Sequence, residues 1–234
     1  MTAQCIIQEL HLLKNPEKAK HLSRFFKTGI GQYGEGDLFL GIPVPQQRCI
    51  AKKHQTATQA TLKTLLQNPY HEVRLTALLI LVEQFTKSKE PHIQKEYIEF
   101  YLSQTPFINN WDLVDLTSYK LLGRWLNDKN RSILYKLAHS ENIWEQRISI
   151  VSCMYFVRQG DFKDCLNIAD ILLQHPHDLI QKAVGWLLRE VGKKNKETLI
   201  LFLASRHQKM PRTMLRYSIE HFSAEERKQY LLRP

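Results

Sequence analysis

The sequence predicts an all-α protein, a solenoid of stacked antiparallel helix pairs. Three observations predict it. Apolar residues recur at helical spacing along most of the 234 residues, strand signals are scarce, and one helix pattern repeats along the chain. We expect helices near residues 2–13, 17–27, 46–53, 56–67, 71–87, 90–104, 110–126, 129–140, 142–158, 162–174, 177–193, 196–206, 211–222 and 224–232.

Helix breakers separate these segments. They are Asn15-Pro16, Asn68-Pro69, Glu90-Pro91, Pro106, His175-Pro176 and Met210-Pro211. One long irregular stretch, residues 29–45, ends at Pro45, which suits the first turn of the next helix. Its glycines do not fit GxGxxG and no strand precedes them, so it is not a dinucleotide-binding loop. Free N–H groups at the following helix start could hold a phosphate, although the sequence favours a plain interhelix loop.

The helix pattern repeats at a nearly constant step. Arg74, Asp115, Arg147, Lys182 and Leu215 occupy equivalent positions, separated by 41, 32, 35 and 33 residues. Helix pairs at that period are typical of a HEAT-like α-solenoid, which curves so that second helices line a concave surface. We therefore expect a single domain over residues 1–234 with a concave basic surface, in which one acid stands among cations.

Composition restricts the class of partner. The chain is 43% hydrophobic and 24% charged, as globular proteins are, and its net charge of +10 favours an anionic partner such as nucleic acid. No run approaches the roughly 18 apolar residues of a membrane span, and no signal peptide is evident. Four cysteines without a CxxC pair and ten scattered histidines predict no metal site. We expect a cytoplasmic monomer without a cofactor.

Asp115 is the most unusual residue of the pattern. On a continuous helix over 110–126 it falls between Trp111 and Leu126 on the apolar arc. A carboxylate there is costly unless it is paired or meets a ligand, so it either braces the fold or does chemistry. Trp111 lies one turn earlier, and an indole beside an acid suits a cationic, planar or sugar-like ligand. Trp111 as a core residue is an equal alternative.

Arg147 is equally unexpected, because it shares an arc with Ile143, Val151 and Met154. A guanidinium there needs an anion, either Asp115 one repeat away or a phosphate. Bracing between repeats and ligand binding both remain open.

Helix 177–193 separates into an apolar face and a cationic stripe. Lys182, Trp186, Arg189 and Lys193 lie almost opposite the core positions, at spacings of 4, 3 and 4 residues. Cations follow phosphates and an indole can contact sugar or base, so the stripe favours nucleic-acid binding. The alternative is that Trp186 packs beneath the stems of neighbouring cations.

Five short motifs occur together in order: YGEGD at 33–37, FLGIP at 39–43, NWDLVD at 110–115, WEQRI at 144–148 and KAVGWLLRE at 182–190. Together they resemble the AlkD-type DNA alkylation repair glycosylases, over about residues 15–222. The resemblance implies a monofunctional DNA glycosylase that releases 3-methyladenine and 7-methylguanine from duplex DNA in base excision repair. Such a protein associates with the nucleoid when it is bound to DNA.

The resemblance also implies residue roles. Asp115 matches the catalytic acid, Trp111 and Trp186 match aromatic walls around the deoxyribose, and Arg147 matches the arginine that accompanies the acid. The expected DNA contacts are Lys182, Arg189 and Lys193 on the stripe and Pro43, Val44 and Gln46 in a DNA-facing loop. That loop lacks polar side chains at its tip, so its contacts would rest on backbone N–H groups. Two rival functions use the same fold: a non-catalytic HEAT-repeat nucleic-acid-binding protein and a protein scaffold.

Overall fold

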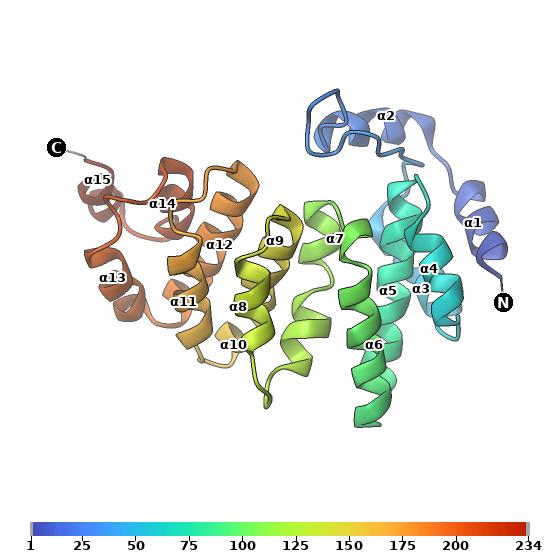
Figure 1. The fold of residues 1–234 in the computed structure, drawn as a ribbon. Coiled ribbons are helices and arrows are strands. Elements are labelled where there is room, and N and C mark those ends of the chain that lie inside the picture. The colour runs from blue at the N-terminus through green and yellow to red at the C-terminus, as the bar shows by residue number, and fades with distance from the viewer. Residues whose placement is uncertain (1, 233–234) are drawn as a thin grey trace. The chain divides into compact units, whose positions relative to one another are not determined.

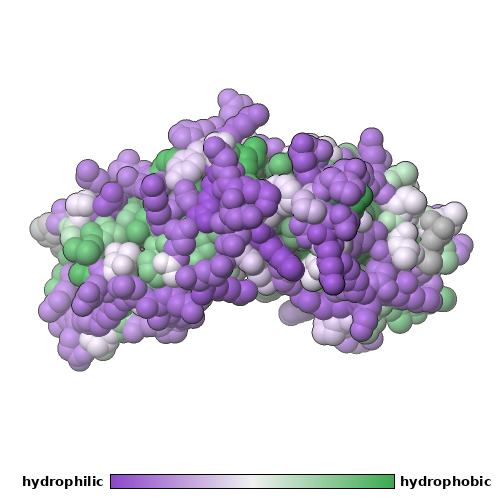
Figure 2. Space-filling view, turned by 90° about the horizontal axis from the view of Figure 1, so that it is seen from below, coloured by the Kyte–Doolittle hydropathy of each residue, from purple (hydrophilic) through white to green (hydrophobic). Residues whose placement is uncertain are grey.

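A computed structural model describes residues 2–232, and it confirms the all-α prediction. Among those residues, the only β-type pairing is an isolated bridge between Leu38 and Tyr70. The chain forms two compact units, Met1–Thr117 and Ser118–Pro234. Each consists of packed helices, as in an α-solenoid (Figure 1). Hydrophilic side chains cover most of the face shown in Figure 2.

The helices of the first unit follow the predicted order. They are α1 (Ala3–Leu12), α2 (Pro16–Phe25), α3 (Val44–Lys53), α4 (Gln59–Leu66), α5 (His71–Lys87), α6 (Pro91–Ser103), the 3-10 turn η1 (Thr105–Phe107) and α7 (Trp111–Asp115). The second unit contains the π-helical turn η2 (Tyr119–Gly123), α8 (Ser132–Ala138), α9 (Ile143–Ser152), α10 (Met154–Arg158), α11 (Lys163–Ile171), α12 (Asp178–Lys194), α13 (Lys196–Ala204), α14 (Arg212–Ser218) and α15 (Ala224–Leu231).

Side-chain caps fix several helix starts where the sequence predicts them. Asn15 accepts from the N–H of Lys18, and Pro16 follows as the first residue of α2. Pro45 lies in the first turn of α3, as expected. Ser223 and Glu226 form a capping box at the start of α15. The side chains of Asn15, Ser223 and Glu226 accept hydrogen bonds from N–H groups that have no partner inside the helix.

One central helix organises each unit. In the first, α5 is buried continuously over residues 71–82, and α3, α4 and α6 pack against it. In the second, α12 buries Ile180, Ala183, Val184, Leu187, Leu188 and Val191, which confirms the predicted apolar face. It packs against α9, α13 and α14. Helix α5 is thus enclosed almost all round by the other helices of its unit.

The segment 110–126 is not one continuous helix, so that prediction is wrong. Helix α7 ends at Asp115, and a π-helical turn follows, in which Gly123 donates to the Ser118 carbonyl at 3.0 Å. Thr117 contributes to the break, because its hydroxyl donates to the Leu113 carbonyl at 2.5 Å and so competes with the helix ladder. The predicted helix 142–158 is also divided, at Cys153.

The break removes the arc that joined Asp115 to Leu126. Trp111 and Asp115 still lie one turn apart on α7, but Leu126 lies in the second unit. The periodicity of residues 110–126 therefore gave the right neighbour for Asp115 within α7 and the wrong one beyond it.

We predict that Gly185→Ala destabilises the second unit. A Cβ at this position would lie 2.6 Å from the Met214 carbonyl oxygen, on the backbone of α14, so the two helices would have to separate. The expected loss is about 1–3 kcal/mol in the free energy of unfolding, measured by urea denaturation.

Gly192→Ala on the same helix is the matched control. Its Cβ would meet only the flexible end of Leu199, at 2.5 Å, and alanine favours the helix. Equal destabilisation by both substitutions would contradict the close approach of α12 and α14 at Gly185.

Candidate functional site

Two of the predicted site residues lie together on α7. Trp111 is its first residue and Asp115 its last, one turn apart, and both side chains are half-buried. Asn110 starts the helix by accepting from the Trp111 N–H at 2.8 Å. Both residues are therefore accessible to a ligand and are placed by a short helix whose start is fixed.

Aromatic rings hold Trp111 on one side. Its indole stacks on Phe26 with ring centroids 5.2 Å apart and planes at 20°. Phe25 meets it edge-on at 5.9 Å. The stack continues from Phe26 to Phe39 at 5.1 Å and to His71 at 4.9 Å. Trp111 is thus neither a plain core residue nor a loose surface ring, since one part is packed and the rest is exposed.

A buried network of charged side chains lies beneath this stack. The His71 Nε2 is 2.8 Å from Asp112, and its Nδ1 is 3.3 Å from Asp37. Asp37 also pairs with Arg74 at 2.6 Å and accepts from the Asn110 side chain at 3.1 Å. These contacts tie α5, α7 and the loop before α3 to one another, and so they fix where α7 presents Trp111 and Asp115.

The network determines the charge of its histidine. Burial alone lowers the pKa of His71, but the carboxylates of Asp112 and Asp37 outweigh burial and raise that pKa to about 9. Burial alone raises the pKa of Asp37, but the hydrogen bond from His71 and the charge of Arg74 bring it below its ordinary value. Two cations and two carboxylates therefore balance in the interior at neutral pH.

The burial of the two acids on α7 corrects the sequence interpretation. The deeply buried acid is Asp112, 7% exposed, and Asp115 is the more accessible one. Periodicity missed the Asp112–His71 pair, although a signal was present. The 41-residue step that aligned Arg74 with Asp115 also aligns His71 with Asp112.

Arg74 was expected among the cations of the concave surface, and that expectation is wrong. It is 5% exposed, and besides Asp37 it bonds the carbonyls of Asn68 and Pro69. Arg74 is buried because the chain before α3 folds over the start of α5.

A buried carboxylate of α5 holds the predicted DNA-facing loop. Glu72, 1% exposed, accepts from the backbone N–H groups of Leu40, Gly41 and Ile42 at 2.9, 2.7 and 3.2 Å. Gly41 has φ 84°, and a Cβ there would lie 2.1 Å from the Asn15 carbonyl oxygen. Glycine is therefore required at this turn.

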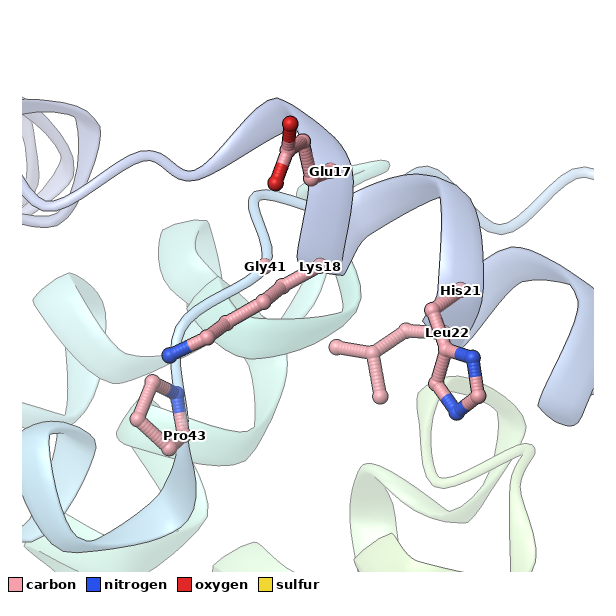
Figure 3. Close-up of a pocket in the computed structure, with 6 residues that line it drawn as sticks. All are labelled: Glu17, Lys18, His21, Leu22, Gly41 and Pro43. Carbon is pink, nitrogen blue, oxygen red and sulfur yellow. The ribbon is translucent and has the colours of Figure 1, made fainter.

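The tip of that loop offers few donors. Pro43 and Gln46 are exposed and Val44 is half-buried. The N–H of Gln46 donates to the Pro43 carbonyl at 3.0 Å, and Pro45 has none. Between α2 and this loop lies a cavity of about 390 Å³ lined by Glu17, Lys18, His21, Leu22, Gly41 and Pro43 (Figure 3). The Lys18 side chain extends toward Pro43 in this view.

The remaining predicted site residues lie in the second unit. Arg147 on α9 is 5% exposed and donates to the Leu179 carbonyl, in the first turn of α12, at 2.5 Å. Trp186 on α12 is half-buried. Trp144, in contrast, is buried in the core.

The cationic stripe of α12 is matched by acids of the same unit. Lys182 lies 2.7 Å from Asp178, and Lys193 lies 2.8 Å from Glu190. Arg189 pairs with Glu220. Each pair is at least partly open to solvent, and pairs of this kind contribute little to stability, typically below about 1 kcal/mol, so a phosphate can replace the carboxylates.

Comparison with known proteins identifies the family of the chain. The chain matches a protein-family model described as DNA alkylation repair enzyme over residues 6–222, and it belongs to that family. A solved structure, a predicted DNA alkylation repair enzyme from Enterococcus faecalis, has a similar fold. Its sequence is 18% identical to this chain, and the two folds superpose with a TM-score of 0.68. The match covers 90% of this chain and 97% of that one. No curated protein matches. The family has a role in the repair of alkylated DNA, which makes DNA the partner.

No helix within residues 2–232 has the length and apolar character needed to cross a membrane.

We predict that the buried network makes stability depend on pH. His71 has a folded pKa of about 9, above its ordinary 6.5, so its stabilisation is complete below pH 6.5 and is lost as pH rises through 9. The difference in unfolding free energy between wild type and His71→Gln should therefore shrink by about 3 kcal/mol from pH 6 to pH 10.

Urea denaturation at both pH values measures this difference. His139→Gln is the control, because His139 is exposed and bonds only its own helix. A wild-type advantage over His71→Gln that is the same at pH 6 and pH 10 would contradict a charged His71.

Proposed function

We propose that this protein is a monofunctional DNA glycosylase that excises N3- and N7-alkylated purines, 3-methyladenine and 7-methylguanine, from duplex DNA. It acts in base excision repair as a monomer without a cofactor. Family membership supports the DNA substrate. The observation that carries the proposal is the arrangement on α7. This helix presents an indole and a half-buried carboxylate one turn apart, and the buried pair of Asp112 with His71 holds it in place.

The two acids of α7 suit different tasks. Asp112 is held by His71 in the interior, where it stabilises the fold. Asp115 lies at the accessible end of the helix and is the carboxylate that a ligand can reach. A reaction centre needs such a division, because a catalytic group must be positioned by other residues that do not themselves react.

The chemistry follows from the lesion. Alkylation at a purine ring nitrogen makes the base cationic and therefore a good leaving group. As the glycosidic bond breaks, positive charge builds on the deoxyribose. Asp115 stabilises that charge and orients or deprotonates the attacking water. Trp111 and Trp186 contact the sugar with ring faces that attract positive charge, and the contact strengthens as the charge grows.

The other predicted residues bind the DNA. The resemblance assigns Arg147 to the acid or to a neighbouring phosphate, either of which would meet the guanidinium's need for an anion. Lys182, Arg189 and Lys193 exchange their carboxylate partners for backbone phosphates. Pro43, Val44 and Gln46 contact the duplex at the loop held by Glu72. Alkylated bases are unstable enough to leave without a deep base-binding pocket, so the enzyme depends little on base readout.

We predict that Asp115→Asn slows release of free methylated base from alkylated duplex DNA by about 10²-fold or more, because the charge that stabilises the sugar cation is gone. Chromatography of the released bases measures this, and circular dichroism checks the fold. Glu96→Gln is the control, because it neutralises an exposed acid of α6 in the same unit and is expected to leave base release unchanged.

The enzyme proposal is wrong if wild type releases no base or if Asp115→Asn releases as much. Duplex binding without any release would instead indicate the non-catalytic nucleic-acid-binding function.

We also predict that Trp186→Ala lowers the rate of base release about 10-fold, since an aromatic contact to a nucleotide is worth about 1–3 kcal/mol. Trp125→Ala is the control, because Trp125 is also half-buried in the second unit but is covered by Lys129, 4.2 Å from its ring. Single-turnover kinetics on alkylated duplex distinguish the two, and equal losses would argue against a sugar contact by Trp186.

A further inference from the structure

Asp115 lies at the end of α7 that the buried network does not hold. The network bonds Asn110 and Asp112, at the start of the helix, whereas Asp115 is its last residue. A separate hydrogen bond lies at this other end, where the hydroxyl of Thr117 donates to the Leu113 carbonyl at 2.5 Å. Asp115 is enclosed in the chain between the two residues of this bond. A side chain that holds Thr117 can therefore set the direction in which Asp115 points.

The side chain beside Thr117 is Tyr101, from the last turn of α6. Tyr101 is 0% exposed, and its hydroxyl has no hydrogen-bond partner among residues 2–232. A buried tyrosine hydroxyl normally has a partner, because an unpaired one costs free energy that a phenylalanine ring in the same space would not. Packing therefore accounts for the ring of Tyr101 but not for its hydroxyl.

The surroundings keep this hydroxyl protonated. Burial raises the pKa of Tyr101 well above its ordinary value, the Thr117 hydroxyl acts against that rise, and the charge of Asp115 adds to it. The phenol is thus a hydrogen-bond donor at neutral pH. The Thr117 oxygen can accept from it while its own proton goes to the Leu113 carbonyl, since a hydroxyl is one donor with two acceptor lone pairs.

We propose that Tyr101 is a positioning residue for Asp115, and that its hydroxyl donates to the Thr117 oxygen when alkylated DNA occupies the site. The proposal rests on the proposed function, in which Asp115 acts on the deoxyribose. Hydrogen bonds at active sites are often long or poorly aligned in the free enzyme and tighten when the substrate binds. The completed chain of bonds runs from Tyr101 to Thr117 and from Thr117 to Leu113, and it fixes the backbone on both sides of Asp115.

Tyr101→Phe tests this role, because it removes only the hydroxyl. The hydroxyl has no partner in the free protein, so the free energy of unfolding should not fall, and the affinity for undamaged duplex DNA should stay the same. Single-turnover release of methylated base from alkylated duplex should slow about 3- to 10-fold, the effect of one lost hydrogen bond between uncharged groups. A purely structural role would instead lower stability and leave the rate of the folded protein unchanged.

The matched control is Tyr97→Phe, which removes a hydroxyl from a half-buried tyrosine of the same helix and should keep the wild-type rate. A wild-type rate in Tyr101→Phe, or an equal loss in Tyr97→Phe, overturns the proposal.

A double-mutant cycle tests the route through Thr117. Thr117→Val keeps the shape of the side chain and removes the oxygen that Tyr101 is proposed to bond. Tyr101→Phe should then cause no further slowing in a Thr117→Val protein, because both changes break the same bond. An undiminished effect of Tyr101→Phe in that background overturns the route.

Hydrogen–deuterium exchange separates this proposal from the glycosylase. Exchange in the peptide that contains α7 should slow when the protein binds a duplex carrying a tetrahydrofuran abasic analogue, and Tyr101→Phe should remove that protection. Protection that depends on Tyr101, in a wild type that releases no base, overturns only the glycosylase. Protection that does not depend on Tyr101, in a wild type that releases base, overturns only the positioning role.

Discussion

The position of the candidate site depends on one buried charge, the imidazolium of His71 between Asp112 and Asp37. Each of its two nitrogens meets a carboxylate from a different part of the chain. Removing one partner from such a group leaves an uncompensated charge in the interior. The free energy lost in this way is much larger than the net stabilisation that the ion pair provides. The loop before α3, the start of α5 and the start of α7 are therefore constrained together, and Trp111 and Asp115 are positioned as a consequence.

The arrangement explains how a helix of five residues can carry a site. Helix α7 is too short to be stable on its own. Its first turn is bonded through Asn110 and Asp112, and its indole is stacked on Phe26. Rigidity is thus supplied by the interior rather than by helix length, and the half-buried carboxylate at the end can remain accessible without loosening the element that holds it.

Much of the fold could be predicted from the sequence, because helical periodicity, prolines and caps are local signals. The apolar face of α12 and the starts of α2 and α3 are examples. The break after Asp115 could not be predicted, since it depends on a threonine hydroxyl bonding its own backbone and on a π-helical turn. The pairing of His71 with Asp112 joins residues 41 positions apart, and periodicity within one helix carries no information about such a contact. Trp111 and Asp115 were found because they share one turn.

Glu72 has a consequence for how the loop proposed to face DNA can vary. Its carboxylate bonds three successive backbone N–H groups and no side chain of the loop. The backbone path from Leu40 to Ile42 is therefore specified by a residue outside the loop, and at Gly41 by the absence of a side chain. Side chains beyond that path, including the Pro-Val-Pro tip, can be exchanged without altering the anchor. Recognition at this loop can then change by substitution while the scaffold keeps its geometry, which makes the tip a suitable place to graft new sequence specificity.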